Sequence, residues 1–168
     1  MSEDTHQQSE SAPVVIGWRE KVDLLEWGLK RVRAKIDTGA RTSAIDVADI
    51  EELEPGKIRF RVVYHHNPEK ITRWIYADTV RKSTVKPSHG QTQERHVCET
   101  LVRMGRVEKR IEISLVSRKG MLCRMLLGRT ALDGLLVDAS QKYVLTDAKR
   151  RARAIKRTTE QPEGETNP

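Results

Sequence analysis

The stretch of sequence that decides the fold is Ala34-Lys35-Ile36-Asp37-Thr38-Gly39-Ala40. Apolar residues alternate along its approach, at Val32, Ala34 and Ile36, as in a strand with one buried face. Thr38 and Gly39 then predict a turn directly after that strand, where Asp37 is presented on a rigid strand end. We interpret the stretch as an active-site turn. The alternative is an ordinary turn in which the aspartate hydrogen-bonds its own backbone.

A second stretch, Met125-Leu126-Leu127-Gly128-Arg129, precedes the short helix-like run Thr130-Ala131-Leu132. In this order, the two stretches resemble the paired signature of the retropepsin-like aspartic peptidases. The resemblance implies that the glycine-containing segment crosses behind the aspartate turn. Leu127 and Gly128 would then support the turn, together with Thr38, Gly39 and Ala40.

The resemblance extends over most of the chain, from Val14 to Thr146, and it is carried by further short stretches. These are Ile16–Glu20, Ala34–Ala44, Glu94–Thr100 and Met125–Leu132, together with Met121. Together they are similar to a bacterial family of small RimB-like retropepsins, often labelled "ATP-dependent zinc protease" and associated with the RimK ATP-grasp glutamate ligase. The family implies a mainly β fold with a closed, retropepsin-like barrel and aspartic peptidase activity.

The chain contains one aspartate turn and no internal repeat of it. Hydrolysis of a peptide by carboxylates requires two of them, one acting as base toward water and the other as acid toward the scissile carbonyl. We therefore predict a homodimer in which each subunit contributes Asp37 as its catalytic residue. The resemblance further implies that Thr38 interlocks with its mate across the two-fold axis, and that the Gly39 carbonyl accepts a hydrogen bond from bound peptide.

Arg41 departs from the viral retropepsins, which usually carry an acidic residue at this position that pairs with the arginine after the second glycine. Here that arginine is Arg129, and two guanidinium groups cannot form the ion pair. Arginine binds carboxylates in a two-pronged geometry. We therefore predict that Arg41 and Arg129 contact an acidic, glutamate-rich peptide substrate. The alternative is an internal ion pair of Arg41, for example with Asp46.

The 168 residues carry 31 basic and 24 acidic side chains, for a net charge of +7, and they suffice for one domain with tails. A basic body favours acidic partners: nucleic acid, acidic peptide or an anionic surface. Two cysteines make no disulfide framework. The polar start lacks the apolar core of a signal peptide, and no apolar run approaches the ~20 residues that span a bilayer, so we expect a cytoplasmic protein.

The expected layout is a disordered arm over residues 1–13, a peptidase domain over 14–146, and a basic, then acidic tail over 147–168. The run Asp147–Lys156 predicts a basic terminal helix. Residues Ser88–Thr92 are a candidate flap tip over the site, so Ser88, His89 and Gly90 are predicted substrate contacts. A plain surface loop is the alternative for these residues.

Local patterns predict several further elements. Lys57–Tyr64, Arg95–Met104 and Arg106–Val116 are expected strands, as are the segments Val14–Trp18, Ala44–Val47, Ile71–Val80, Leu122–Leu127, Leu135–Val137 and Tyr143–Leu145. Glu51–Gly56 is expected to be an acidic loop, and the polar run Arg81–Glu94 is expected to be turn-forming. Thr130–Asp133 is expected to form one helical turn.

We expect no metal or other cofactor, because the chain has neither a His-Glu-x-x-His run nor a phosphate-binding G-x-x-x-x-G-K-[ST] loop. The scattered candidates for zinc are His65, His66, His89, His96 and Cys98. A zinc peptidase is therefore one alternative. Another is a non-catalytic adaptor or regulator of a RimK-like ligase, with the basic segment of residues 149–157 contacting the ribosome or RNA.

Overall fold

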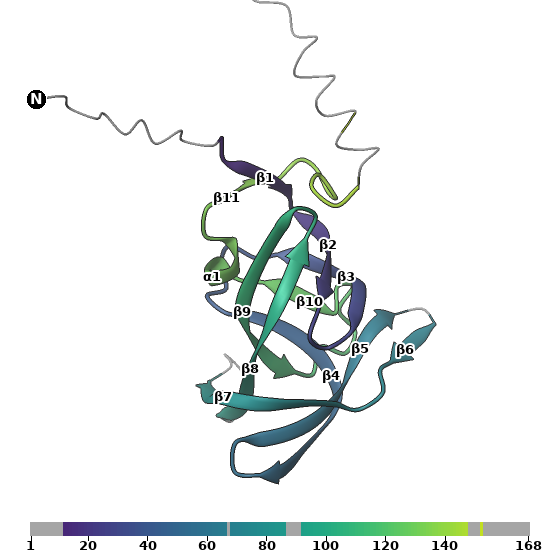
Figure 1. Ribbon diagram of the computed structural model, residues 1–168, viewed down its shortest axis with the longest axis vertical. Helices are drawn as coiled ribbons and strands as arrows, with labels where there is room; N and C mark the ends of the chain where they lie inside the picture. The colour runs from purple at the N-terminus through teal and green to yellow at the C-terminus, as the bar shows by residue number, and fades with distance from the viewer. Residues whose placement is uncertain (1–11, 67, 87–91, 148–151, 153–168) are drawn as a thin grey trace, which may run out of the picture.

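The computed structural model describes residues 12–66, 68–86, 92–147 and 152. Nearly all regular structure in this part of the chain is β, as predicted (Figure 1). The elements are β1 (Val14–Gly17), β2 (Arg19–Leu24), β3 (Leu29–Ile36), β4 (Ser43–Glu54), β5 (Lys57–His66), β6 (Glu69–Ile71), β7 (Ile75–Val85), β8 (Gln93–Met104), β9 (Val107–Val116), β10 (Met125–Leu127), α1 (Arg129–Leu132) and β11 (Leu135–Asp138).

Nine of these strands form one sheet in the order β2-β3-β10-β4-β9-β8-β7-β5-β6, and two extra pairings close it. The pairing of β2 with β8 closes a ring of six strands, and the pairing of β4 with β5 closes a second ring. The rings share β4, β9 and β8, whose length lets each strand bend from one ring into the other. The predicted closed, mainly β fold is therefore confirmed. A separate parallel pair, β1 and β11, lies beyond α1 (Figure 1).

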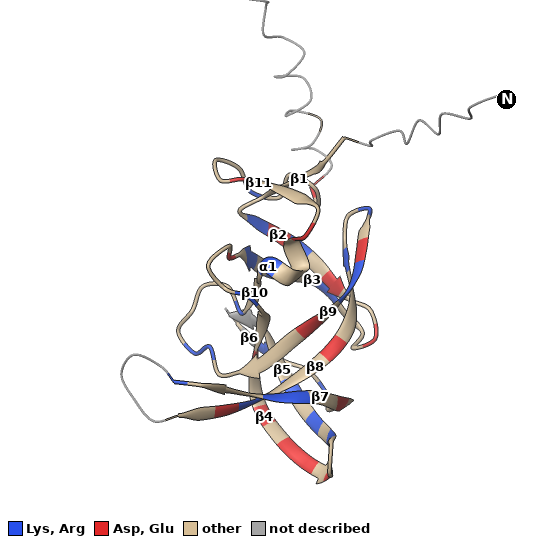
Figure 2. Ribbon diagram, turned by 90° about the vertical axis from the view of Figure 1, so that its left-hand side faces the viewer, with Lys and Arg blue, Asp and Glu red and all other residues tan. Residues whose placement is uncertain are grey.

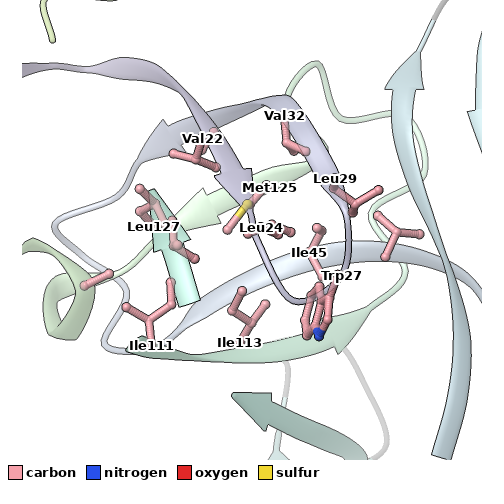
Figure 3. Close-up of a cluster of buried hydrophobic side chains, with 14 of the residues drawn as sticks. Val22, Leu24, Trp27, Leu29, Val32, Ile45, Ile111, Ile113, Met125 and Leu127 are labelled. Atoms are coloured by element: carbon pink, nitrogen blue, oxygen red, sulfur yellow. The ribbon is translucent and has the colours of Figure 1, made fainter. Parts of the chain in front are cut away.

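The core fills the ring formed by β2, β3, β10, β4, β9 and β8. Figure 3 shows Val22 and Leu24 of β2, Val32 of β3, and Met125 and Leu127 of β10 pointing into one cluster. Trp27 extends the cluster toward the second ring by packing edge-on against Phe60, with 5.1 Å between ring centroids. This burial of apolar side chains is the main stabilising contribution to the fold.

A buried carboxylate ties the start of the domain to its end. Glu20 is fully buried, and its Oε1 accepts hydrogen bonds from the backbone N–H groups of Gly17 (2.8 Å) and Leu145 (3.1 Å). Its Oε2 accepts from the Thr146 backbone N–H (3.1 Å) and hydroxyl (2.5 Å). These four hydrogen bonds offset the cost of removing the Glu20 carboxylate from water. Glu20 therefore holds the segment after β11 against the barrel.

That anchor also explains why the predicted strand Tyr143–Leu145 is wrong. Tyr143 has a left-handed backbone with φ 59°, and its carbonyl accepts a hydrogen bond from the backbone N–H of Asp147, as in a turn. Leu145 and Thr146 donate their backbone N–H groups to Glu20 rather than to a neighbouring strand. The apolar pattern Tyr-Val-Leu here reflects burial of Leu145 in the core and not a strand.

The predicted acidic loop at Glu51–Gly56 is also wrong, because β4 continues to Glu54 and turns at Pro55 and Gly56 into β5. Cross-strand ion pairs explain the acidic sequence. Arg59 bonds Glu51 at 2.5 Å and Arg61 bonds Asp49 at 2.5 Å. Figure 2 shows red segments on β4 and blue segments on β5 along this hairpin. These charged side chains are exposed and pair across the two strands, so they do not indicate a loop.

Two other boundaries differ from prediction. The polar run Arg81–Glu94 is strand at both of its ends, since β7 continues to Val85 and β8 begins at Gln93, with Thr84 paired to Glu94. The strand expected over Leu122–Leu127 is limited to β10, because Leu122 is exposed and Arg124 turns inward to Asp46. The sequence also gave no prediction for β2, whose polar surface residues alternate with Glu20, Val22 and Leu24.

Residues 1–11, the C-terminal segment 148–151 and residues 153–168 lie outside the described residues, so the predicted arm, tail and terminal helix stay predictions. Among the described residues, no helix is long and apolar enough to cross a membrane.

Replacing Glu20 by alanine is expected to lower the free energy of unfolding by about 3 kcal/mol, because buried backbone donors lose their acceptor. Thermal or urea unfolding measures this loss. Glu108→Ala is the control, since Glu108 is exposed and pairs with Arg103 on the surface, and it should cost under about 1 kcal/mol. Equal losses in the two variants would contradict the anchoring role of Glu20.

Candidate active site

The aspartate turn begins where β3 ends, and β10 fixes its position. β10 runs parallel to β3, with Leu127 opposite Ile36, and antiparallel to β4. The backbone N–H of Asp37 continues this ladder by donating to the Leu127 carbonyl at 2.9 Å. The main chain of Asp37 is therefore held by a strand that comes from the other end of the sequence.

The Asp37 carboxylate is half-exposed and uses one oxygen to shape the turn. Its Oδ1 accepts hydrogen bonds from the backbone N–H groups of Gly39 (3.0 Å) and Ala40 (3.1 Å). No residue in the described part of the chain bonds the second oxygen, Oδ2. The aspartate thus stabilises its own turn, as in the simpler interpretation, and keeps an oxygen available for further chemistry.

Gly128 lies against the backbone of the chain that leaves the turn. A Cβ atom at this position would lie 2.7 Å from the Arg41 carbonyl oxygen and 2.7 Å from the Thr42 carbonyl carbon, closer than real Cβ atoms approach backbone. Its N–H donates to the Ser43 hydroxyl (3.2 Å), and the next residue donates from its N–H to the Ala40 carbonyl (2.8 Å). The glycine is required because only hydrogen fits between the two segments.

The Arg129 side chain hydrogen-bonds the main chain of the turn. Its Nη1 donates to the carbonyl oxygens of Thr38 (3.1 Å) and Gly39 (2.9 Å). Thr130, in the same short helix α1, donates from both its N–H and its hydroxyl to the Arg41 carbonyl. In this structure Arg129 therefore positions the turn. Its contact with substrate stays a prediction, and so does the role of the Gly39 carbonyl.

The predicted alternative partner of Arg41 is wrong. Asp46 is buried, and its Oδ2 pairs with Nη1 of buried Arg124 at 2.5 Å. Its Oδ1 accepts from the backbone N–H of Arg118 at 2.6 Å. Asp46 is therefore saturated by other groups, whereas the Arg41 side chain is exposed and has no ion pair with any described residue.

The loop between β9 and β10 holds Arg118, which the sequence analysis did not single out. Its side chain is half-buried. This burial lowers the pKa of the Arg118 guanidinium, while the charges of Asp46, Cys123 and Asp37 act in the opposite direction. Nothing in the sequence around Ser117–Gly120 distinguishes it from a surface turn.

The candidate flap residues Ser88, His89 and Gly90 lie outside the described residues. The strands on either side, β7 and β8, form an antiparallel hairpin whose last described pair joins Val85 to Gln93. The connection between them therefore lies at a hairpin tip, the kind of element predicted for a flap. Contact of the tip with substrate stays a prediction.

Two of the zinc candidates lie in the described part of β8 with side chains resolved. The His96 ring bonds the Thr79 hydroxyl (3.1 Å) and lies 3.2 Å from a Glu52 oxygen. Cys98 is buried in the core, and that burial, with a smaller effect of Asp78, raises the pKa of its thiol to about 12. Among the described residues, no three His, Cys, Asp or Glu side chains converge in a way that would hold a metal ion.

A single Asp-Thr-Gly turn at a barrel strand end, held by a glycine-containing crossing strand, defines the retropepsin-like class of fold. The chain belongs to the RimB-like family, described as "Retropepsin-like aspartic endopeptidase RimB", whose family model matches residues 15–148. The family predicted from the sequence motifs is therefore confirmed.

Curated relatives carry the same domain within longer proteins. A "Probable alpha-L-glutamate ligase" of Shewanella pealeana is 32% identical over 136 residues, which cover 78% of this chain and 30% of the relative. A protein of the same name from Desulfotalea psychrophila is 30% identical over 139 residues, covering 80% and 30%. The chain thus spans about a third of the length of the relatives it matches.

A solved structure shares the fold. The crystal structure of a protein of unknown function from Legionella pneumophila superposes with a TM-score of 0.66 at 26% identity, covering 80% of this chain and all of the other. The similarity includes the barrel but assigns no activity, because that protein's function is itself unknown.

Gly128→Ala is expected to displace the turn and lower the free energy of unfolding by about 3 kcal/mol, because its methyl group meets backbone rather than a flexible side chain. Chemical unfolding measures the loss. Gly56→Ala is the control: nothing lies within 4 Å of its Cβ position, although its φ of +82° carries a backbone cost of about 1 kcal/mol. Equal losses would show that the close approach at Gly128 is unimportant.

Proposed function

We propose that this protein is a homodimeric aspartic peptidase in which two Asp37 side chains share one site. The observation that carries the proposal is the Asp37 carboxylate, fixed through Oδ1 while Oδ2 stays without a partner among the described residues. A chain with one such turn supplies half of the required pair. The family description as an aspartic endopeptidase supports the same conclusion.

In the proposed reaction, two carboxylates at contact distance share one proton and titrate as a pair. The ionised carboxylate takes a proton from water, which attacks the scissile carbonyl carbon. The protonated carboxyl gives its proton to the carbonyl oxygen. Collapse of the tetrahedral intermediate then breaks the C–N bond, and the amine leaves with a proton returned by the pair.

Exposed groups around the turn support a dimer. Thr38 and Gly39 are exposed, which leaves the Thr38 hydroxyl available to its mate across the axis. Val15 of β1 and Leu136 of β11 are adjacent in register and are 43% and 54% exposed. These strands lie next to α1, which contacts the turn (Figure 1). A second copy would cover both the turn and these apolar side chains.

The proposed substrate is an acidic, glutamate-rich peptide or tail. Arg41 and Arg129 flank the turn, and the chain carries a net charge of +7. The relatives named as glutamate ligases contain this domain in the same polypeptide, which supports a RimK-like ligase as a functional partner. A peptidase that removes glutamates would oppose a ligase that adds them.

The adaptor alternative draws on the same relatives, because a domain within a ligase can act by binding alone. Its second element, the basic segment 149–157 that would contact the ribosome or RNA, lies outside the described residues. Deleting residues 147–168 and assaying peptide hydrolysis and RNA binding separately distinguishes the two functions.

Asp37→Asn should reduce hydrolysis of a glutamate-tailed peptide by about a thousandfold or more, because it removes the proton acceptor from both halves of the pair. Product release measured by chromatography tests this. Asp49→Asn is the control and should keep wild-type turnover, because Asp49 lies on β4 and its exposed side chain pairs with Arg61 of β5. Undiminished cleavage by Asp37→Asn would rule out the proposed role.

Mixing the two proteins tests whether the site needs two copies. After subunit exchange of equal amounts of wild type and Asp37→Asn, about a quarter of the dimers retain both carboxylates, so about a quarter of the activity should remain. Independent subunits would keep about half. Sedimentation of each protein and of the mixture provides the accompanying measure of dimerisation.

A further inference from the structure

The outer face of the β2–β3 hairpin places like charges opposite each other. In the antiparallel register of the two strands, Arg19 is paired with Lys35 and Lys21 with Arg33. The residues that alternate with these four are buried, so the four side chains lie on the face of the strands that points away from the core. We call these four residues the basic face.

This arrangement opposes folding. Like charges directly opposite each other destabilise an antiparallel pair of strands. Elsewhere in the same sheet such a pair is compensated, since Glu99 lies opposite Glu112 and each of them forms an ion pair with an arginine. At the basic face, none of the four cations forms an ion pair with a carboxylate of the described residues. A local arrangement that costs stability without a compensating contact indicates a role in binding.

The acids around the basic face are committed to the main chain. Glu20 is buried beneath it and accepts four hydrogen bonds. Asp23, at the end of β2, accepts the backbone N–H of Arg31 at 2.8 Å. Asp37, directly after β3, shapes the aspartate turn. Against the two acids within β2 and β3 stand six cations of the same strands, namely Arg19, Lys21, Lys30, Arg31, Arg33 and Lys35.

Two aromatic rings border the basic face, and each stacks with one of its cations. The Arg19 guanidinium carbon lies 4.6 Å from the centroid of the Trp18 ring, and Lys21 Nζ lies 4.9 Å from that of Tyr143. Both aromatic residues are half-buried, so part of each remains accessible. Single-stranded nucleic acids are bound by this combination of groups, because cations bind the phosphates while bases stack on rings and on arginine.

The surroundings favour nucleic acid over other polyanions. Anionic membranes are bound by cations together with apolar side chains that insert into the lipid, and none of the exposed large apolar side chains of the described residues lies on β2 or β3. An acidic peptide has no base to stack on the rings. The segment with Tyr143 runs beside β2, because its N–H donates to the Arg19 carbonyl. Six more lysines and arginines follow in the sequence over residues 149–157.

We propose that the basic face, with Trp18 and Tyr143 at its border, binds single-stranded nucleic acid. Phosphates bound to the four cations supply the anions that the described chain lacks there, and they remove the repulsion between the opposed pairs. This is a binding function in addition to the proposed peptidase, and it does not depend on the Asp37 carboxylate. Because the ligand compensates an arrangement that is unfavourable in the free protein, its binding also stabilises the fold.

The test measures binding of a labelled single-stranded RNA of about 16 nucleotides to the full chain, by fluorescence anisotropy at several salt concentrations. The double variant Lys21→Gln/Arg33→Gln should weaken binding by about tenfold and lower the slope of log K against log salt by about 0.7 for each removed cation. The control Arg61→Gln/Arg81→Gln removes the same charge from two ion-paired arginines of the second ring, and it should leave affinity and slope nearly unchanged. Equal effects of the two double variants, or no binding of the RNA by the parent, would overturn the proposal.

Thermal unfolding without RNA separates a binding role from a structural one. Because Lys21→Gln/Arg33→Gln removes a pair of opposed like charges, its unfolding temperature should equal or exceed that of the parent. A lower temperature would show that the cations serve the fold, against the proposal.

Competition identifies the class of ligand. Unlabelled RNA should displace the labelled RNA, whereas an oligoglutamate peptide and vesicles of phosphatidylserine and phosphatidylcholine should do so weakly at the same concentration of negative charge. Displacement by the peptide or the vesicles as effective as that by RNA would show that the face binds any polyanion, and would overturn its assignment to nucleic acid.

Discussion

The close approach of Gly128 to the backbone of Arg41 and Thr42 is the constraint on which the site depends. β10 lies between β3 and β4, so the chain that leaves β3 must cross the end of β10 before it can enter β4. The crossing is possible only because residue 128 has no side chain. Backbone bonds from Asp37 to Leu127 and from Arg129 to Ala40 then lock both sides of the crossing. The position of the carboxylate follows from the fold rather than from local flexibility.

Arg41 stands where viral retropepsins usually carry an acidic residue, so the usual ion pair with the arginine after the second glycine cannot form at this turn. Arg129 bonds two turn carbonyls, and the Arg41 side chain is exposed. Asp46 is committed to Arg124 and to the backbone N–H of Arg118, so it pairs with neither Arg41 nor Arg129.

The sequence predicted those parts of the fold that depend on short-range pattern. The alternation at Val32, Ala34 and Ile36 located β3, and the Leu-Leu-Gly-Arg stretch located β10 and α1. The predictions were wrong where a strand carries many charged side chains. Glu51 and Glu54 were interpreted as loop residues because their cross-strand partners, Arg59 and Lys57, are visible only once the hairpin is paired. The alternative pairing of Arg41 with Asp46 was wrong for a related reason, since Arg124 and the Arg118 backbone, which bind Asp46, are distant from it in sequence.

The pairing of β3 with β10 has a consequence for how the protein comes into being. Asp37 is synthesised about ninety residues before the strand that holds it, as the separation of Arg129 from Gly39 shows. Domains generally fold as units during translation. A nascent chain therefore carries the aspartate well before the strand that holds its turn has been synthesised, and the turn can form only when β10 pairs with β3.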